Sequence, residues 1–153
     1  MLITNLLNVA KKRPPDVIIG DTDSPYMRRW FIIPQNKIIN IYLHHFLRSD
    51  DDRALHDHPW SNLSILLKGS YTEHSVRPGQ IEVKSVLQKR QVKFRISGKY
   101  AHRIELTDGE CWTLFITGPK YRKWGFHCKG GWVPWNQFLT PNKNQSGTTG
   151  CPD

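Results

Sequence analysis

Apolar and polar residues alternate in short runs along most of the chain, which is the pattern of β-strands with one buried face. Val92, Phe94 and Ile96 share one phase, for example, while Lys93 and Arg95 share the other. From residue 30 onward this pattern predicts strands at residues 30–33, 37–47, 62–68, 71–76, 81–87, 92–96, 100–106, 112–117 and 132–138. Pro78-Gly79 and Asp108-Gly109 are turn sequences, and the second predicts a hairpin.

Many short antiparallel strands at this spacing predict an all-β sandwich or barrel. The 153 residues fit one domain, which we expect to span residues 1–140, followed by a flexible tail at 141–153 rich in Asn, Gly and Thr. Residues 2–10 have apolar side chains at helical spacing and are followed by Lys11-Lys12-Arg13, so we predict a short N-terminal helix. The basic triplet lies on the wrong side for a signal peptide, and no apolar run approaches the roughly 20 residues that span a bilayer.

The net charge of +9 is concentrated in residues 84–129, where eleven Lys or Arg face only Glu105, Asp108 and Glu110. This basic segment is either a nucleic-acid-binding surface or the solvated face of alternating strands. The solvated face is favoured, because no known nucleic-acid-binding motif accompanies the charges. Three widely separated cysteines without CxxC spacing argue against a disulfide framework and favour a reducing, cytoplasmic environment.

The segment around His56 and His58 is the clearest chemical signal. In an extended backbone, residues i and i+2 point to the same face about 7 Å apart, so both imidazoles can reach one ion. His102 falls in the phase of Ile104 and Leu106, which places it on the apolar face of its predicted strand. The alternatives are a solvated histidine pair and a hydrogen-bonded core histidine, and a three-histidine metal site is favoured because the three occur together.

These residues resemble a known family. His56-x-His58, then Asn62 and Gly69, is similar to the first motif of the cupin superfamily, except that a typical cupin has a glutamate where this chain has Asn62. Residues 97–102 are similar to the second motif, without its proline and with three residues between glycine and histidine. The resemblance covers roughly residues 38–117.

The resemblance implies a small jelly-roll barrel in which His56, His58 and His102 bind one divalent transition metal from facing strands. Three neutral imidazoles leave the ion its full +2 charge, which favours an anionic substrate. Imidazole suits several metals, Zn, Ni, Mn and Cu among them; Fe is expected first, because similar cupins, notably thiol dioxygenases, hold ferrous iron with three histidines. An oxygenase is therefore the leading hypothesis.

Further residues border this motif. Tyr100 is expected on the face of His102, either as a proton donor to substrate or as a core tyrosine. Asn62 is expected to bind the metal weakly or to hydrogen-bond a substrate or water. Arg53 could bind a substrate carboxylate, although Asp50-Asp51-Asp52 offers a local ion pair. The expected substrate contacts are completed by Trp60 and Tyr71.

Two other classes of function stay open. One is a non-catalytic cupin that binds a small molecule or sugar. The other is a nucleotide-sugar isomerase or epimerase, in which His102 would be the base and Tyr100 the acid. Homodimerisation through strands is expected from the resemblance alone. The aromatic residues Trp124, Phe126, Trp132 and Trp135 could line a pocket or close one end of the barrel.

Overall fold

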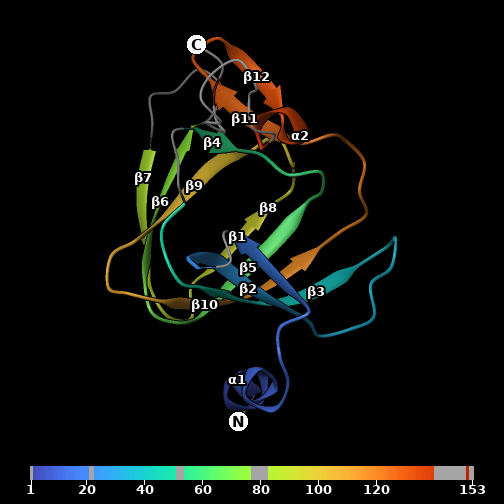
Figure 1. Ribbon diagram of the computed structural model, residues 1–153, viewed down its shortest axis with the longest axis vertical. Coiled ribbons are helices and arrows are strands. Elements are labelled where there is room, and N and C mark those ends of the chain that lie inside the picture. Colours follow the sequence, from blue (N-terminus) through green and yellow to red (C-terminus); the bar gives the residue numbers. More distant parts are fainter. Residues whose placement is uncertain (1, 21–22, 51–53, 77–82, 140–150, 152–153) are drawn as a thin grey trace.

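Two antiparallel β-sheets make up most of the molecule. The computed structural model describes residues 2–20, 23–50, 54–76, 83–139 and 151. Within these residues, two sheets of six strands each face one another, with a helix below them (Figure 1). The predicted all-β class is confirmed.

The first sheet has the order β1-β2-β3-β10-β5-β8, and the second has the order β12-β11-β4-β9-β6-β7. The strands of the first sheet are β1 (Val17–Gly20), β2 (Pro25–Phe31), β3 (Asn40–Phe46), β10 (Cys111–Thr117), β5 (Asn62–Lys68) and β8 (Val92–Arg95). Those of the second are β12 (Gly131–Pro134), β11 (Gly125–Cys128), β4 (Leu55–His56), β9 (Ala101–Leu106), β6 (Tyr71–Val76) and β7 (Val83–Leu87).

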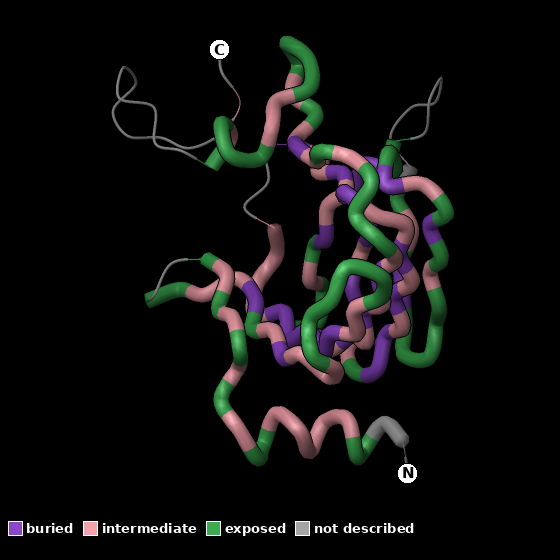
Figure 2. Tube along the Cα trace, turned by 90° about the vertical axis from the view of Figure 1, so that its right-hand side faces the viewer, coloured by how far each residue is buried: buried purple, intermediate pink, exposed green. Residues whose placement is uncertain are grey.

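The core lies between the sheets, because alternate residues of each strand point inward. Figure 2 shows the buried stretches gathered in the two sheets, while residues 4–12 of the N-terminal helix are partly buried or exposed. The inward apolar cluster draws on both sheets and consists of Met27, Phe46, Leu66, Tyr71, Leu87, Ile104 and Cys111.

Helix α1 (Leu2–Lys12) confirms the predicted N-terminal helix and covers the outer face of the first sheet. Leu6, Val9 and Ala10 pack against a second cluster centred on Trp30 and Leu43. Trp30 stacks on Trp112 with ring centroids 5.6 Å apart, which joins β2 to β10 on this face. The first sheet thus buries apolar residues on both faces, whereas its inner face also carries polar residues.

Several sequence-based expectations differ from the structure. The predicted strand at residues 132–138 is wrong beyond Pro134, because Trp135–Phe138 form the short helix α2. The hairpin at Asp108-Gly109 is also wrong: β9 belongs to the second sheet and β10 to the first, so this turn carries the chain between sheets. Strands β1, β4 and β11 were not predicted, and Pro78-Gly79 lies outside the described residues.

The expectation that the cysteines stay unpaired is wrong. Cys128 and Cys151 form a disulfide across a sequence separation of 23 residues, and Cys111 is a buried free thiol. The pairing was missed because the two residues are far apart in sequence and meet only through the fold. The predicted flexible tail lies outside the described residues except at Cys151, which the disulfide attaches to β11.

The described helices include none with the length and apolar character required to cross a membrane.

Candidate metal centre

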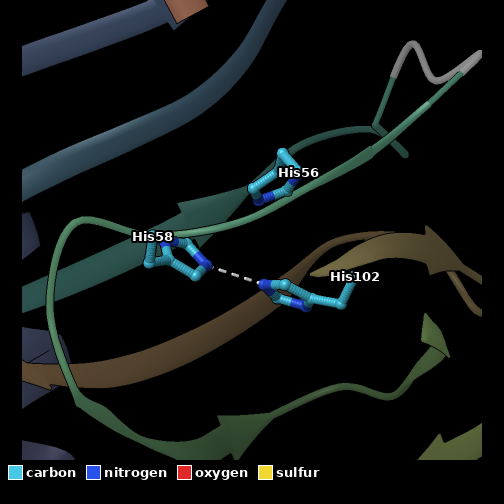
Figure 3. Close-up of side chains that lie close together, drawn as sticks. All are labelled: His56, His58 and His102. Atoms are coloured by element: carbon cyan, nitrogen blue, oxygen red, sulfur yellow. Dashed lines mark hydrogen bonds between the residues drawn. The ribbon is translucent and has the colours of Figure 1, made fainter. Parts of the chain in front are cut away.

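Three imidazoles converge at one place in the second sheet. His56 ends the short strand β4, His58 follows two residues later, and His102 lies on β9 directly opposite His56 in the strand pairing. The ligand atoms of the three rings all lie within 4.8 Å of one another, and Nε2 of His58 is 2.8 Å from Nε2 of His102 (Figure 3). The pairing of β4 with β9 therefore brings together residues that are 46 positions apart in sequence.

This arrangement fits a transition-metal ion. Two imidazole nitrogens bound to one ion at about 2.1 Å are about 3.0 Å apart at a right angle and about 3.4 Å apart at a tetrahedral angle, so a small separation of the His58 and His102 rings would admit the ion. A hydrogen bond at this distance requires one ring to donate its Nε2–H to the other Nε2, since two lone pairs at 2.8 Å repel each other. A cation that replaces this proton would relieve the same repulsion.

Two of the rings, those of His58 and His102, are held in the neutral form that binds metals. Burial, and then the charges of neighbouring groups, lower the pKa of His58 well below its ordinary value. Burial and the positive charge of Arg95 lower the pKa of His102 to about 3, although Glu73 acts in the opposite direction. Both imidazoles are therefore neutral around pH 7, and no proton has to leave a charged ring before a metal binds.

A buried carboxylate lies behind His102. The side chain of Glu73, which is 1% exposed on β6, has an oxygen 3.4 Å from Nδ1 of His102 and forms an ion pair with Arg95 of β8. Burial alone would raise the pKa of Glu73, but the interactions with His102 and Arg95 lower it well below the usual range. The carboxylate favours the tautomer with the proton on Nδ1, which leaves Nε2 available to a metal.

Sequence reasoning missed both Glu73 and Arg95. A signal was present for Glu73, which shares the inward phase of Tyr71 on β6. For Arg95 the pattern was misleading, because the structure buries Arg95 and exposes the apolar residues of its strand, Val92 and Phe94.

A cavity of about 510 Å³ adjoins the three histidines, within the size range of small-molecule sites. Its described lining includes all three imidazoles together with Trp60 and Tyr71. Aromatic residues from the C-terminal part of the chain form one wall, where Trp124 stacks on Trp135 and Phe126 stacks on Phe138. We call these four residues the aromatic wall.

The residue between the two neighbouring histidines attaches this wall to the metal centre. Asp57 is 1% exposed and accepts hydrogen bonds from the Gly125 backbone N–H at 2.8 Å and the Trp132 indole at 3.0 Å. Burial tends to raise its pKa, but hydrogen bonds with His127 and Arg122 lower the pKa of Asp57 to about 2. Asp57 thus ties β11 and β12 to the His56–His58 segment.

The other expected site residues do not all lie at the cavity. Trp60 and Tyr71 line the cavity, as a substrate contact requires. The amide oxygen of Asn62 accepts a hydrogen bond from Arg95 at 3.2 Å, and its buried Nδ2 has no partner among the described residues, so the oxygen is engaged away from the metal. Arg53 lies outside the described residues.

The expectation that Tyr100 shares the inward face of His102 is wrong. β9 begins at Ala101, so the strand alternation does not extend to Tyr100, which is 37% exposed and absent from the described cavity lining. This position leaves the isomerase hypothesis without its expected acid.

Two further polar residues enter the cavity from the first sheet. Arg29 of β2 and His44 of β3 are opposite each other in the strand pairing, and both line the cavity. The neighbouring His45 points to the other face of the sheet, as the alternation of β3 requires. There its ring stacks on that of Trp112, with ring centroids 3.8 Å apart. Strand β2 was predicted only from residue 30 onward, so Arg29 was not recognised as an inward residue.

Comparisons with known proteins show the fold. No protein-family model matches the chain, and no curated protein matches it by sequence. A cupin-2 domain from Rhodospirillum rubrum has a similar structure, with a TM-score of 0.58, 13% identity, and coverage of 75% of this chain and 76% of that one. This similarity confirms the small jelly-roll fold.

Iron enzymes are also similar in fold. Crystalline Fe(II) HppE has a TM-score of 0.55 at 12% identity, with 70% of this chain and 57% of that chain covered. Hydroxypropylphosphonic acid epoxidase from S. wedmorenis has a TM-score of 0.51 at 12% identity, with 69% and 57% covered. The chain therefore spans a little over half the length of these enzymes.

Proposed function

We propose that the protein is a metal-dependent cupin that binds a divalent transition metal through His56, His58 and His102 and acts on a small anionic molecule in the adjoining cavity. The single observation that carries this proposal is the convergence of the three ligand atoms within 4.8 Å beside a cavity of about 510 Å³. The jelly-roll fold supports it, because the cupin-2 domain and the iron enzyme HppE have the same architecture.

Oxygenase chemistry is the leading form of this proposal, with Fe(II) as the first metal to test. An Fe(II) ion held by three neutral imidazoles would keep open positions for an anionic substrate group and oxygen. The chain's own groups would position the substrate: Trp60 and Tyr71 by contact in the cavity, and the aromatic wall by excluding water. Asn62 would act indirectly, through its hydrogen bond to Arg95.

Elemental analysis of purified variants tests the metal centre. Wild type should retain about one equivalent of metal, and His56→Ala, His58→Ala and His102→Ala should each lose most of it while remaining folded by circular dichroism. The matched control is His45→Ala, because His45 lies on the opposite face of β3 and outside the cluster. Unchanged metal content in all three cluster variants would contradict the proposal.

Oxygen uptake tests the activity separately. Iron-loaded protein should consume oxygen with small carboxylate- or phosphate-bearing molecules and not with their neutral analogues. If metal is retained and none of these molecules supports oxygen uptake while some bind, the protein is a non-catalytic binding cupin instead.

A further inference from the structure

The cavity has an excess of positive side chains. Its described lining contains three arginines, Arg29, Arg48 and Arg95, and one carboxylate, Asp50. Arg95 is paired with buried Glu73 and also bonds Asn62. Arg48 donates to the backbone oxygen of Ser24 at 3.1 Å. Arg29 differs from Arg95 because none of its described contacts is to a carboxylate.

The position of Arg29 is fixed by two contacts. Its Nε donates a hydrogen bond to Nε2 of His44 at 2.9 Å, and its guanidinium lies 4.9 Å from the ring centroid of Tyr42. His44 is neutral, because burial and the charge of Arg29 lower its pKa well below its ordinary value, and Tyr42 meets the guanidinium with the face of its ring. The two contacts orient the guanidinium but do not neutralise it.

The donors at Nη1 and Nη2 stay available to the cavity. Nε is the side-chain atom of Arg29 that bonds a described residue. Nη1 and Nη2 are not among the buried atoms without a partner, so they are open to the cavity that Arg29 lines. Burial without a neighbouring carboxylate lowers the pKa of the guanidinium, yet arginine stays protonated around pH 7. A partly buried guanidinium with two parallel N–H donors matches the geometry of a carboxylate or phosphate.

The placement relative to the metal centre gives such a site a use. His44 stacks on Phe115 with centroids 5.2 Å apart, and His58 lies 5.9 Å from the same ring. One aromatic side chain therefore separates the Arg29–His44 pair from the histidine cluster, within a single cavity. A small molecule could thus reach both ends.

We propose that Arg29, oriented by His44, binds the oxyanion group, a carboxylate or phosphate, of the small molecule that occupies the cavity. The inference rests on the proposed function for the role of the molecule's other end, but the oxyanion site itself requires no metal. A purely structural role, in which Arg29 only supports His44, would leave anion affinity unchanged when Arg29 is replaced.

The test is an NMR titration of metal-free protein, prepared on a chelating resin, with inorganic phosphate and, separately, with acetate. Binding should be saturable and should shift the Nε–Hε signal of Arg29. Arg29→Gln should weaken binding about tenfold or more. Arg28→Gln is the matched control, since this substitution removes the same charge from the adjacent, exposed position of β2. It should change the anion affinity by less than about twofold. Tighter acetate binding would identify a carboxylate site, and tighter phosphate binding a phosphate site.

Arg29→Lys keeps the test decisive where Arg29→Gln does not fold. Lysine retains the charge but cannot offer two parallel donors, so a several-fold loss is expected. Equal affinities in wild type, Arg29→Lys and Arg29→Gln, or no saturable binding by wild type, would overturn the proposal. Because the protein is metal-free in this experiment, anion binding that depends on Arg29 stands even if the elemental analysis finds no metal centre.

Discussion

Nδ1 of His102 lies 3.4 Å from a carboxylate oxygen of Glu73. Glu73 comes from β6, the strand that pairs with β9, and its other oxygen lies 3.2 Å from Nζ of Lys93 on β8. The carboxylate therefore connects the histidine cluster with positive side chains of the opposite sheet. Such partners orient a ligating imidazole and raise its basicity.

Replacing Glu73 by Gln should weaken metal binding by about 10–100-fold, because the carboxylate no longer orients His102. The same change should lower the free energy of unfolding by about 3 kcal/mol, since buried Arg95 loses its charged partner. Competition with a chelator measures the first effect and urea denaturation the second. The matched control is Glu105→Gln, an exposed carboxylate that bonds His74 on the other face. Equal losses in both variants would contradict this role for Glu73.

Replacing Asp57 by Asn should loosen the attachment of β11 and β12 to the metal centre. An amide cannot accept all the hydrogen bonds made by this carboxylate, whose ion pair with Arg122 is 3.1 Å long. We expect a loss of about 2–4 kcal/mol in unfolding free energy, measured by urea denaturation, and weaker metal binding. Asp108→Asn, at an exposed turn, should change stability by less than about 0.5 kcal/mol. A metal affinity unaffected by Asp57→Asn would show that the anchoring does not matter to the site.

Replacing Gly98 by Ala should displace the His56–His58 segment. A Cβ at Gly98 would lie 2.2 Å from the carbonyl oxygen of His58, while the Gly98 carbonyl accepts the His58 backbone N–H at 2.9 Å. The overlap should cost about 1–3 kcal/mol in unfolding free energy and reduce metal affinity. Gly130→Ala is the control, because nothing lies within 4 Å of a Cβ there. Thermal unfolding and metal titration of both variants would reveal the difference, and identical behaviour would refute the steric argument.

The three cysteines should react very differently with an alkylating reagent at pH 8. Burial raises the pKa of the Cys111 thiol to about 12, and the other two cysteines are joined in a disulfide. Mass spectrometry should therefore find no label on the native protein, one label after unfolding, and three after reduction and unfolding. Two or more labels on the unfolded, unreduced protein would mean that Cys128 and Cys151 are not joined.

The histidine cluster could be predicted from sequence because each part of its geometry is local: the spacing of His56 and His58, and the position of His102 along β9. The i, i+2 spacing of His56 and His58 and the inward phase of His102 fixed their faces, and the structure brings the three rings together. The strands Asn62–Lys68 and Tyr71–Val76 were predicted with the bounds that the structure has, and Cys111–Thr117, the most regularly alternating strand, was predicted to within one residue. Alternation over a full strand is a strong signal because it depends only on the backbone repeat.

The remaining parts depend on contacts between distant segments. Strand β4 has two residues, too few for any alternation, and exists because it pairs with β9 and β11. Asp108-Gly109 has the composition of a hairpin turn, but local turn chemistry does not determine which sheet the next strand joins. Tyr100 was misplaced for a similar reason, since the strand begins one residue after it. Arg29 and Arg95 read as ordinary polar positions until the opposite sheet is known.

The disulfide has a consequence for the integrity of the aromatic wall. Trp135 and Phe138 lie between Cys128 and Cys151, so both belong to the segment that this bond closes into a covalent ring. A protease that cuts the backbone once anywhere between these cysteines would leave both fragments attached through sulfur. A nicked molecule would keep all its residues, gain only the mass of one water, and separate into two pieces only in the presence of a reductant.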